Sequence, residues 1–324
     1  MKLGLRFKRF FYRRILKPNI LKLYQKENAM VDRRNTIAST EQSPNRFDIP
    51  MGLIEHAKQG KPNNIMNRST ARPMISNIRN IHKSYDSLSE NSEKPKGKIT
   101  DAILEELKDF GKKHGIVNLG FTKLPHHLIF KEKAVLHDNA IVLVLEMDED
   151  KIAKAPSRET VGMVMHTYNN LGIAANKIAE FLRNYGYSAH ASHPLGGIVL
   201  YPPLASSAGL GWFGRHGLLI TPEFGPRVRL AAVFTNITNL PFAEENPHSW
   251  IPRQCATCGK CIKSCPPKSL YEQPIINENG LKTHNDGTKC FPYFTGNYGC
   301  SICIKVCPFS TTGYKKLHEK VMKK

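Results

Sequence analysis

No cysteine occurs before position 255 of this 324-residue chain, and no uninterrupted apolar run approaches the length of a membrane span. A spanning helix needs about 20 predominantly apolar residues, so none is expected. The opening residues are basic but lack the apolar core of a secretory signal, and neither pair of adjacent arginines, at 13–14 and 33–34, precedes such a stretch. The sequence therefore predicts a cytoplasmic protein, in a reducing compartment that disfavours structural disulfides.

Acidic residues are also scarce: 27 Asp and Glu stand against 47 Lys and Arg, a formal net charge of +20. Residues 1–99 hold 21 of the basic and 8 of the acidic side chains, and they are rich in Asn, Ser and Pro with little apolar periodicity. Such a composition is typical of disorder. We therefore expect residues 1–97 to form a basic, largely disordered tail.

One part of this tail, residues 3–24, can form a basic amphipathic helix. Such a helix can lie on an anionic membrane surface, which would place the protein at the membrane periphery, or contact RNA. A solvated tail that is ordered only by a partner is the alternative.

The eight cysteines fall into two runs near the end of the chain. The first is Cys255-x2-Cys258-x2-Cys261-x3-Cys265-Pro, and the second is Cys290 followed by Cys300-x2-Cys303-x3-Cys307-Pro. Two [4Fe–4S] clusters are held by runs of this spacing, in which the last Cys of each run ligates the other cluster. One-electron transfer is thus the expected chemistry.

This pattern predicts two ligand sets. The first cysteine set is Cys255, Cys258, Cys261 and Cys307; the second cysteine set is Cys265, Cys290, Cys300 and Cys303, which we expect to hold the outer cluster. Zinc is a weaker alternative, because zinc sites use four ligands in two separated pairs. No cysteine remains as a candidate nucleophile.

Strands alternating with helices predict an α/β sandwich core over residues 98–246. Helices are expected after Thr100, ending at Gly115, and from Ser157 to Tyr185; buried strands are expected over residues 116–122, 140–146, 217–221 and 228–235. Residues 247–324 then form a C-terminal α+β domain that carries the cysteines.

A glycine-rich stretch precedes the cysteines. Gly209, Gly211 and Gly214 form a GxGxxG that does not follow a predicted strand, so it is a weak dinucleotide signal. Together with Gly217 and Gly225 these glycines predict either a flat surface without side chains, facing a large planar ligand, or a set of tight turns.

The segment AGLGWFGRHGLLITPEFGPRVRLAAVFTNI, followed by these cysteine runs, resembles the superfamily of epoxyqueuosine reductases and corrinoid reductive dehalogenases over residues of about 100–310. The resemblance implies an α/β domain that binds cobalamin with its lower base detached. It also implies a ferredoxin-like domain whose two clusters pass electrons to the cobalt for reduction of a small or nucleoside-type substrate. Reduced ferredoxin or flavodoxin is the implied donor. A ferredoxin-type electron-transfer protein without corrinoid is the alternative reading.

The chain departs from the epoxyqueuosine reductases, which carry an aspartate before the AGLGW element, because residues 190–207 contain no carboxylate. Tyr201 and His193 are therefore the candidate proton donors. The candidate corrinoid contacts are Gly209, Gly211, Gly214, Arg215, His216 and Arg227. Arginines here, Arg229 included, bind phosphate, amide or substrate anion groups, or form ordinary salt bridges.

Overall fold

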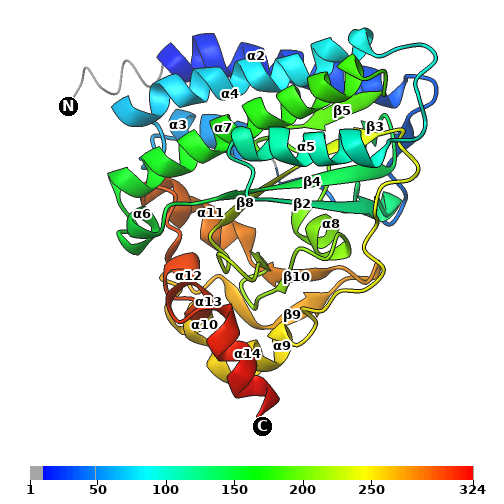
Figure 1. The fold of residues 1–324 in the computed structure, drawn as a ribbon. Coiled ribbons are helices and arrows are strands. Elements are labelled where there is room, and N and C mark those ends of the chain that lie inside the picture. The colour runs from blue at the N-terminus through cyan, green and yellow to red at the C-terminus, as the bar shows by residue number, and fades with distance from the viewer. Residues whose placement is uncertain (1–9, 48, 324) are drawn as a thin grey trace.

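The computed structural model describes residues 10–47 and 49–323, and it shows a mixed α/β fold around a four-stranded antiparallel sheet (Figure 1). The strand order is β2-β4-β8-β5. The four strands are β2 (Asn118–Lys123), β4 (Asn139–Glu146), β8 (Val228–Thr235) and β5 (Ala189–Ser192). The mixed α/β class and three of the expected strands are thus confirmed, whereas β5 was not anticipated.

Both faces of the central strands are buried. Along β4, Ile141 and Leu143 point into one apolar cluster, and Val142 and Val144 point into another on the opposite face. Successive side chains of a strand alternate between faces, so a strand covered on both sides is apolar throughout. Helices α5 (Asp101–Lys113) and α7 (Arg158–Asn184) cover one face, and α8 (Tyr201–Ser207) covers the other.

The two long helices begin where the sequence predicts. The Thr100 hydroxyl accepts from the backbone N–H of Ile103 at 3.4 Å, and the Ser157 hydroxyl accepts from that of Thr160 at 3.1 Å. These bonds satisfy N–H groups that have no partner within the helix.

The expectation of a disordered tail is wrong for residues 10–97 as far as the structure describes them. This segment forms η1 (Phe11–Leu16), α2 (Lys17–Val31), α3 (Ile49–Lys58), α4 (Arg68–Asp86) and η2 (Ser87–Glu90). Its apolar side chains share one buried cluster with α7 and with the cysteine-bearing part of the chain. The apolar surface is therefore buried only in the tertiary fold, which composition and periodicity do not reveal.

Residues 1–9 lie outside the described residues, so the predicted helix over 3–24 is described only from residue 10. There Phe11 and Tyr12 are 2% exposed, within the fold. Contact of this segment with a membrane or RNA stays a prediction.

A buried ion cluster fastens α2 to the rest of the molecule. The Glu27 carboxylate has no exposed surface and accepts from Arg46 at 2.8 Å and from Lys133 at 2.8 Å. Two cations thus compensate one buried anion, as a charge taken out of water requires.

The glycine-rich stretch forms a small hairpin, β6 (Trp212–Phe213) with β7 (Leu219–Ile220), outside the main sheet. The strand expected over 217–221 is thus shorter and lies in a different sheet. The chain reverses at Gly214–Gly217, where Gly214 N–H donates to Leu218 O at 3.0 Å and Gly217 has φ +75°.

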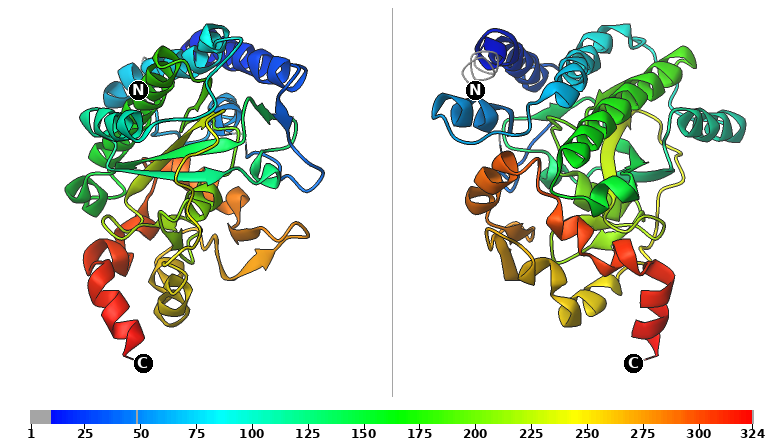
Figure 2. Two further views of the ribbon diagram at one scale, coloured as in Figure 1. Left: turned by 45° about the vertical axis from the view of Figure 1, so that its right-hand side comes forward. Right: turned by 90° about the vertical axis from the view of Figure 1, so that its left-hand side faces the viewer.

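The C-terminal part lies below the sheet in Figure 1 and remains there in the turned views of Figure 2. Its elements are α9 (Ile251–Cys258), α10 (Lys260–Lys263), β9 (Leu270–Ile276), β10 (Lys282–Asn285), α11 (Gly287–Gly296), α12 (Ile302–Lys305), α13 (Pro308–Thr311) and α14 (Tyr314–Met322). A small apolar cluster around Trp250, Phe309 and Leu317 holds it together. Its ferredoxin-like character and the boundaries at residues 97 and 246 stay predictions.

The remaining short elements are β1 (Ile37–Ala38), paired with β3 (Ala134–Val135), η3 (His126–Leu128) and α6 (Glu149–Ala153). None of the helices within the described residues combines the length and the apolar character needed to cross a membrane.

Candidate functional site

The first cysteine set surrounds one cavity of about 330 Å³. Cys255 and Cys258 come from α9, and Cys261 comes from α10 after the chain turns at Gly259, whose φ is +60°. Cys307 precedes α13 and joins them from the second run. Burial raises the pKa of the Cys255 thiol to about 11, against the lowering effect of Arg215, and that of Cys307 to about 12, against a backbone hydrogen bond from Phe309. A bound cation would favour the thiolates further.

The second cysteine set is gathered in the same way around Cys303. Burial raises the pKa of the Cys303 thiol, and the neighbouring thiols of Cys300 and Cys290 raise it further. Cys265 lies close enough to Cys290 to act on it in the same manner. Cys261 of the first set also acts on Cys303, so the partition of the cysteines into two ligand sets stays a prediction.

The described residues contain no group of three or more His, Cys, Asp or Glu that is close enough to hold a single metal ion. One zinc ion would draw all its thiolates to about 2.3 Å from the same point. The cysteines of each set therefore lie near one another but do not converge on one position, as the ligands of a single metal ion would.

A second, much larger cavity of about 1650 Å³, including its open mouth, lies next to the first cysteine set; we call it the large cavity. It is bordered by the segment before α3, by α7, by the loop before α8, by the β6–β7 turn and by β10. Among its lining residues are Arg46, Tyr168, Tyr201, His216 and His284.

His216 lines both cavities and is therefore the wall between them. Its Nδ1 accepts from the backbone N–H of Leu218 at 3.1 Å, which leaves the proton of the neutral ring on Nε2. Burial, assisted by His284, lowers the pKa of His216 to about 4, so the ring is neutral at pH 7. Its Nε2 has no hydrogen-bond partner among the described residues.

Tyr201 reaches the large cavity, but its hydroxyl is occupied. The Oη atom donates to the backbone oxygen of His193 at 3.0 Å and lies 2.7 Å from the Ser192 hydroxyl. Burial raises the pKa of Tyr201. These contacts hold the ring in place rather than presenting its proton to a ligand.

His193, the other predicted proton donor, does not line the large cavity as the structure describes it. Its ring lies against α7, where a Cβ atom on Gly172 would come within 1.9 Å of His193 Nε2. Burial lowers its pKa to about 3. A neutral imidazole is a weak acid at pH 7, and this ring is turned toward a helix, so the geometry does not favour His193 as the proton donor, and its role stays a prediction.

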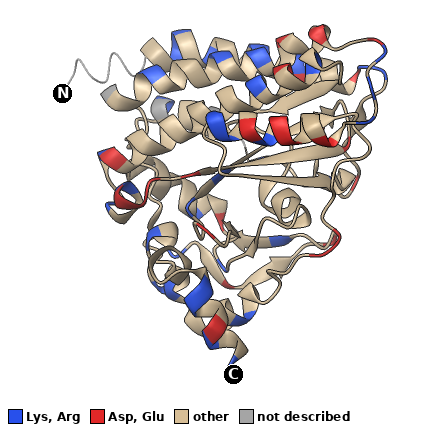
Figure 3. Ribbon diagram, in the orientation of Figure 1, with Lys and Arg blue, Asp and Glu red and all other residues tan. Residues whose placement is uncertain are grey.

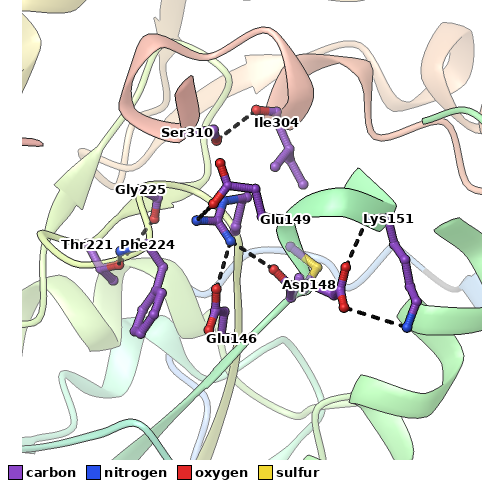
Figure 4. A network of polar contacts seen from close by, with 11 residues as sticks. Glu146, Asp148, Glu149, Lys151, Thr221, Phe224, Gly225, Ile304 and Ser310 are labelled. Atoms are coloured by element: carbon purple, nitrogen blue, oxygen red, sulfur yellow. Dashed lines mark hydrogen bonds and ion pairs between the residues drawn. The ribbon is translucent and has the colours of Figure 1, made fainter. Parts of the chain in front are cut away.

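Arg227 is engaged elsewhere as well. Its guanidinium donates to Glu146 at 2.8 Å and to Glu149 at 2.9 Å; Figure 4 labels these two glutamates in the polar network to which they belong. Of the two arginines predicted as cofactor contacts, only Arg215 lines a cavity described above, that of the first cysteine set. Its backbone oxygen accepts from His284 Nδ1 at 3.2 Å, which fixes the β6–β7 turn on β10.

The predicted flat glycine surface is wrong. An added Cβ would meet Ala243 at Gly209, the backbone oxygen of Ile220 at Gly211, and the His216 ring at Gly214. These glycines therefore allow the chain to pack closely against itself, as tight turns do. Gly217 does border the large cavity.

The arrangement that sequence reasoning missed is the pair of Tyr168 and Arg229. Arg229 Nη1 donates to Tyr168 Oη at 3.0 Å, and the guanidinium lies 4.2 Å from the centre of the Tyr168 ring. A phenolate at this position would be stabilised by the adjacent positive charge. Tyr168 belongs to the apolar stripe of α7, which is why its sequence context indicates a core residue.

Tyr168 also borders a third cavity, of about 770 Å³, which is almost entirely apolar; we call it the apolar cavity. It adjoins the large cavity through Leu23, Ile49, Leu195 and Gly196. No Asp or Glu is among the described residues that line either of these cavities.

No model of a known protein family matches the chain. Tetrachloroethene reductive dehalogenase from Sulfurospirillum multivorans is 35% identical over 195 residues, which are 57% of this chain and 38% of that protein. Epoxyqueuosine reductase from Listeria monocytogenes is 34% identical over 209 residues, 60% of this chain and 53% of that protein. The chain thus spans between about a third and a half of the length of these relatives.

The similarity in fold covers more of this chain than the similarity in sequence does. The solved structure of a catabolic reductive dehalogenase superposes with a TM-score of 0.68 at 19% identity, covering 90% of this chain and 45% of that one. The fold likeness therefore extends beyond the segment of matching sequence. On the combined likeness in sequence and fold, the chain belongs to the superfamily that unites reductive dehalogenases and epoxyqueuosine reductases.

Proposed function

We propose that this protein is a reductase that passes electrons through two [4Fe–4S] clusters to a cobalamin bound in the large cavity. The observation that carries the proposal is His216, one residue that borders both the first cysteine set and the large cavity. An electron acceptor in the large cavity would lie one side chain away from a cluster held by that set.

The cysteines fit clusters in a ferredoxin-like domain. Each thiolate of a [4Fe–4S] cluster binds a different iron, so the four sulfurs surround a cage instead of meeting at one ion. The separation of the cysteines within each set and the cavity of about 330 Å³ support this reading over a zinc site.

The large cavity fits a corrinoid. Its enclosed volume of about 590 Å³ lies within the 300–1000 Å³ of small-molecule sites, and it opens into a mouth that brings the whole space to about 1650 Å³. Asn277, Thr283 and Asn285 line it from the β9–β10 side, where Asn277 Nδ2 donates to Thr283 Oγ1 at 3.0 Å and leaves its own oxygen as an acceptor for amide groups at the rim of such a ligand. Cobalamin supplies, when bound, a reducible cobalt centre that a protein side chain cannot provide.

The residues of the chain would supply the proton. Reduction of a substrate R–X to R–H and X⁻ consumes two electrons and one proton. Tyr168 Oη can give that proton into the cavity, and Arg229 at 3.0 Å stabilises the phenolate that is left. Apolar walls exclude water, which strengthens this charge pairing.

The cavities favour a small apolar substrate over a nucleoside. The apolar cavity offers almost no polar surface beside Tyr168, and no described carboxylate faces either cavity. A nucleoside needs hydrogen-bond partners for its base and ribose, and burying it without them costs affinity. An apolar organohalide of the tetrachloroethene type needs no such hydrogen-bond partners.

The proposal is tested by anaerobic reconstitution with iron and sulfide, followed by titration with hydroxocobalamin. We expect about eight irons per chain and a shift of the cobalamin spectrum to its base-off form at one equivalent. Leu281→Trp, at a residue that borders the large cavity, is the matched variant and should abolish the shift without loss of iron. Eight irons without any spectral change would leave an electron-transfer protein without corrinoid and overturn the proposal.

Substrate class is tested on the loaded protein with tetrachloroethene and with an epoxyqueuosine-containing RNA stem-loop. We expect chloride release from the first and no reduction of the second. Turnover of the RNA alone would contradict the assignment to apolar substrates.

A further inference from the structure

The ring of His216 carries a proton that no described residue accepts. His216 is 6% exposed, and its Nε2 atom is fully buried without a hydrogen-bond partner among the described residues. Its Nδ1 accepts from the backbone N–H of Leu218 at 3.1 Å, so Nε2 is the protonated nitrogen of the neutral ring. A buried donor without an acceptor is costly to a fold, and it therefore points to an acceptor that binds beside it.

The two cavities that His216 borders differ in their access to solvent. The large cavity has an open mouth, so a nitrogen turned toward it would have exposed surface. The cavity of about 330 Å³ within the first cysteine set is smaller and more enclosed. Because Nε2 is shielded from solvent, the burial of this atom favours the cavity of the first cysteine set as the place of the missing acceptor.

The residues before His216 support this placement. The backbone N–H of Arg215 donates a hydrogen bond to the sulfur of Cys255, which lowers the pKa of that thiol against the effect of burial. The β6–β7 turn thus already contacts the first cysteine set through its backbone. Gly214 leaves room for the ring, because an added Cβ atom would come within 2.6 Å of His216 Cε1.

The surroundings favour an acceptor that is bound rather than built in. No Asp or Glu is among the described residues that line either cavity beside His216. Lys and Arg predominate around α14 in this part of the molecule, as Figure 3 shows. Hydrogen bonds to the sulfurs of an iron–sulfur cluster are among the factors that set its reduction potential. A cluster in the first cysteine set would therefore supply the acceptor that the protein lacks.

We propose that His216 donates a hydrogen bond from Nε2 to a sulfur of the cluster in the first cysteine set and thereby raises the reduction potential of that cluster. This inference rests on the proposed function, which supplies the clusters. Reduction adds negative charge to a cluster, so a hydrogen-bond donor stabilises the reduced state more than the oxidised state. The bond favours the movement of an electron from the second cysteine set to the cluster beside the large cavity.

The test separates the two nitrogens of the ring. His216→Asn removes the Nε2 donor and keeps a side-chain oxygen that can accept from the backbone N–H of Leu218 in place of Nδ1. His216→Gln is the matched control, because its longer amide can place an N–H where Nε2 lies and loses the Nδ1 acceptor instead. Both variants replace the ring by an amide of the same chemistry.

The variants and the unaltered protein are reconstituted with iron and sulfide, without cobalamin, and reduced stepwise at controlled potential. Electron paramagnetic resonance measures the reduced fraction of each cluster, and the signal that is altered in Cys258→Ser identifies the cluster of the first cysteine set. The other cluster serves as an internal reference in every sample.

We expect the reduction equilibrium of the first cluster to become about tenfold less favourable in His216→Asn, which is a fall of about 59 mV in its potential. The equilibrium of the other cluster should change by less than about twofold. His216→Gln should keep the potential of the first cluster close to that of the unaltered protein. All three proteins should hold about eight irons per chain.

Three results would overturn the inference. The first is the same potential in His216→Asn and the unaltered protein. The second is an equal decrease in both variants, because the cause would then be a disturbed turn and not the lost donor. The third is unchanged potentials together with weaker hydroxocobalamin binding in His216→Asn alone, which would place the Nε2 proton in the large cavity. A protein that takes up no iron would instead refute the proposed function, and this is seen before any redox titration.

Discussion

At the scale of single residues, two tyrosines reach the large cavity with different surroundings. The Tyr168 hydroxyl accepts a hydrogen bond from a cation, Arg229, whereas the Tyr201 hydroxyl donates to the backbone oxygen of His193. The Tyr168 hydroxyl thus lies against a cation, whereas the Tyr201 hydroxyl is taken up by the His193 oxygen and the Ser192 hydroxyl.

The Tyr168→Phe variant should therefore lower kcat by about 10²- to 10⁴-fold with little effect on cobalamin binding. Turnover by the loaded enzyme and the base-off spectrum measure the two properties separately. The matched Tyr201→Phe variant should keep kcat within a few-fold and lose about 1 kcal/mol of stability with its hydrogen bond. The opposite pattern would return the role of acid to Tyr201.

A buried histidine makes stability depend on pH. The ring of His190 packs between Tyr85 and Phe234, and neither nitrogen has a hydrogen-bond partner among the described residues. Burial, assisted by the charges of His137 and Arg33, lowers its pKa to about 3. The unfolded chain, with an ordinary histidine pKa near 6.5, therefore binds a proton first as pH falls.

Because the folded state has the lower pKa, this stability is complete above about pH 6.5 and is lost between there and about pH 3. His190→Phe removes the titrating group and keeps an aromatic ring. When the pH is lowered from 7.5 to 5.5, the free energy of unfolding of the unaltered protein should decrease by about 1.4 kcal/mol more than that of the His190→Phe variant. Urea denaturation under nitrogen at both pH values measures the difference, with the half-buried surface residue His127 replaced by Phe as control. Parallel pH dependence in His190→Phe and the unaltered protein would contradict the account.

At the scale of elements, the helices that the sequence predicts are those with local signals. Thr100 and Ser157 are cap residues followed by an apolar stripe, and α5 and α7 start directly after them. The capping box at Asn67 and Thr70 before α4 is a signal of the same kind, and sequence reasoning missed it in a segment of polar composition. Helix α2 has no side-chain hydrogen bond at its N-cap. Its apolar side chains are buried because they pack in one cluster with residues of α4 and α7.

The position of α2 should depend on its buried ion cluster. Glu27→Gln removes the negative charge and leaves Arg46 and Lys133, which are 16% and 12% exposed, next to each other. Breaking a buried pair from one side costs about 3–5 kcal/mol, because the remaining charge is uncompensated. We expect a lower urea midpoint and faster tryptic cleavage between residues 32 and 46.

The control is Asp86→Asn, which breaks an exposed pair between the end of α4 and Lys26, the residue before Glu27 in α2. An exposed pair contributes about 0–1 kcal/mol, so the loss should be small. Equal destabilisation by the two variants would show that burial does not determine the strength of the Glu27 contact.

At the scale of the whole molecule, one part of the site can be predicted from residue spacing in the sequence. The other part is brought together only by the fold. The cysteine sets follow from short, regular spacings within the last part of the chain. Tyr168 and Arg229 are 61 residues apart, on a helix and a strand, and no local pattern connects them. Arg227 fits a phosphate-binding role in sequence, but Glu146 and Glu149, on another strand and the helix after it, neutralise it.

The C-terminal part should depend on iron more than the α/β core does. Its own apolar cluster is small, centred on Trp250, Phe309 and Leu317, whereas two large clusters fill both faces of the sheet. Metal-binding energy is folding energy where the apolar core is small. After removal of iron, hydrogen exchange should rise over residues 250–323 and stay slow in β4 and β8. Uniform exchange with and without iron would contradict this division.

The last prediction concerns how the two cysteine runs cross. Cys307 ends the second run but borders the cavity of the first cysteine set, and Cys265 ends the first run but lies beside Cys290. Cys307→Ser should therefore impair the same cluster as Cys258→Ser, and Cys265→Ser the same cluster as Cys303→Ser, each variant retaining about four irons. Electron paramagnetic resonance of the reduced variants would then show two matching pairs of spectra. If each run instead held its own cluster, Cys307→Ser would match Cys303→Ser, and the cluster beside His216 would be completed by Cys265 instead of Cys307.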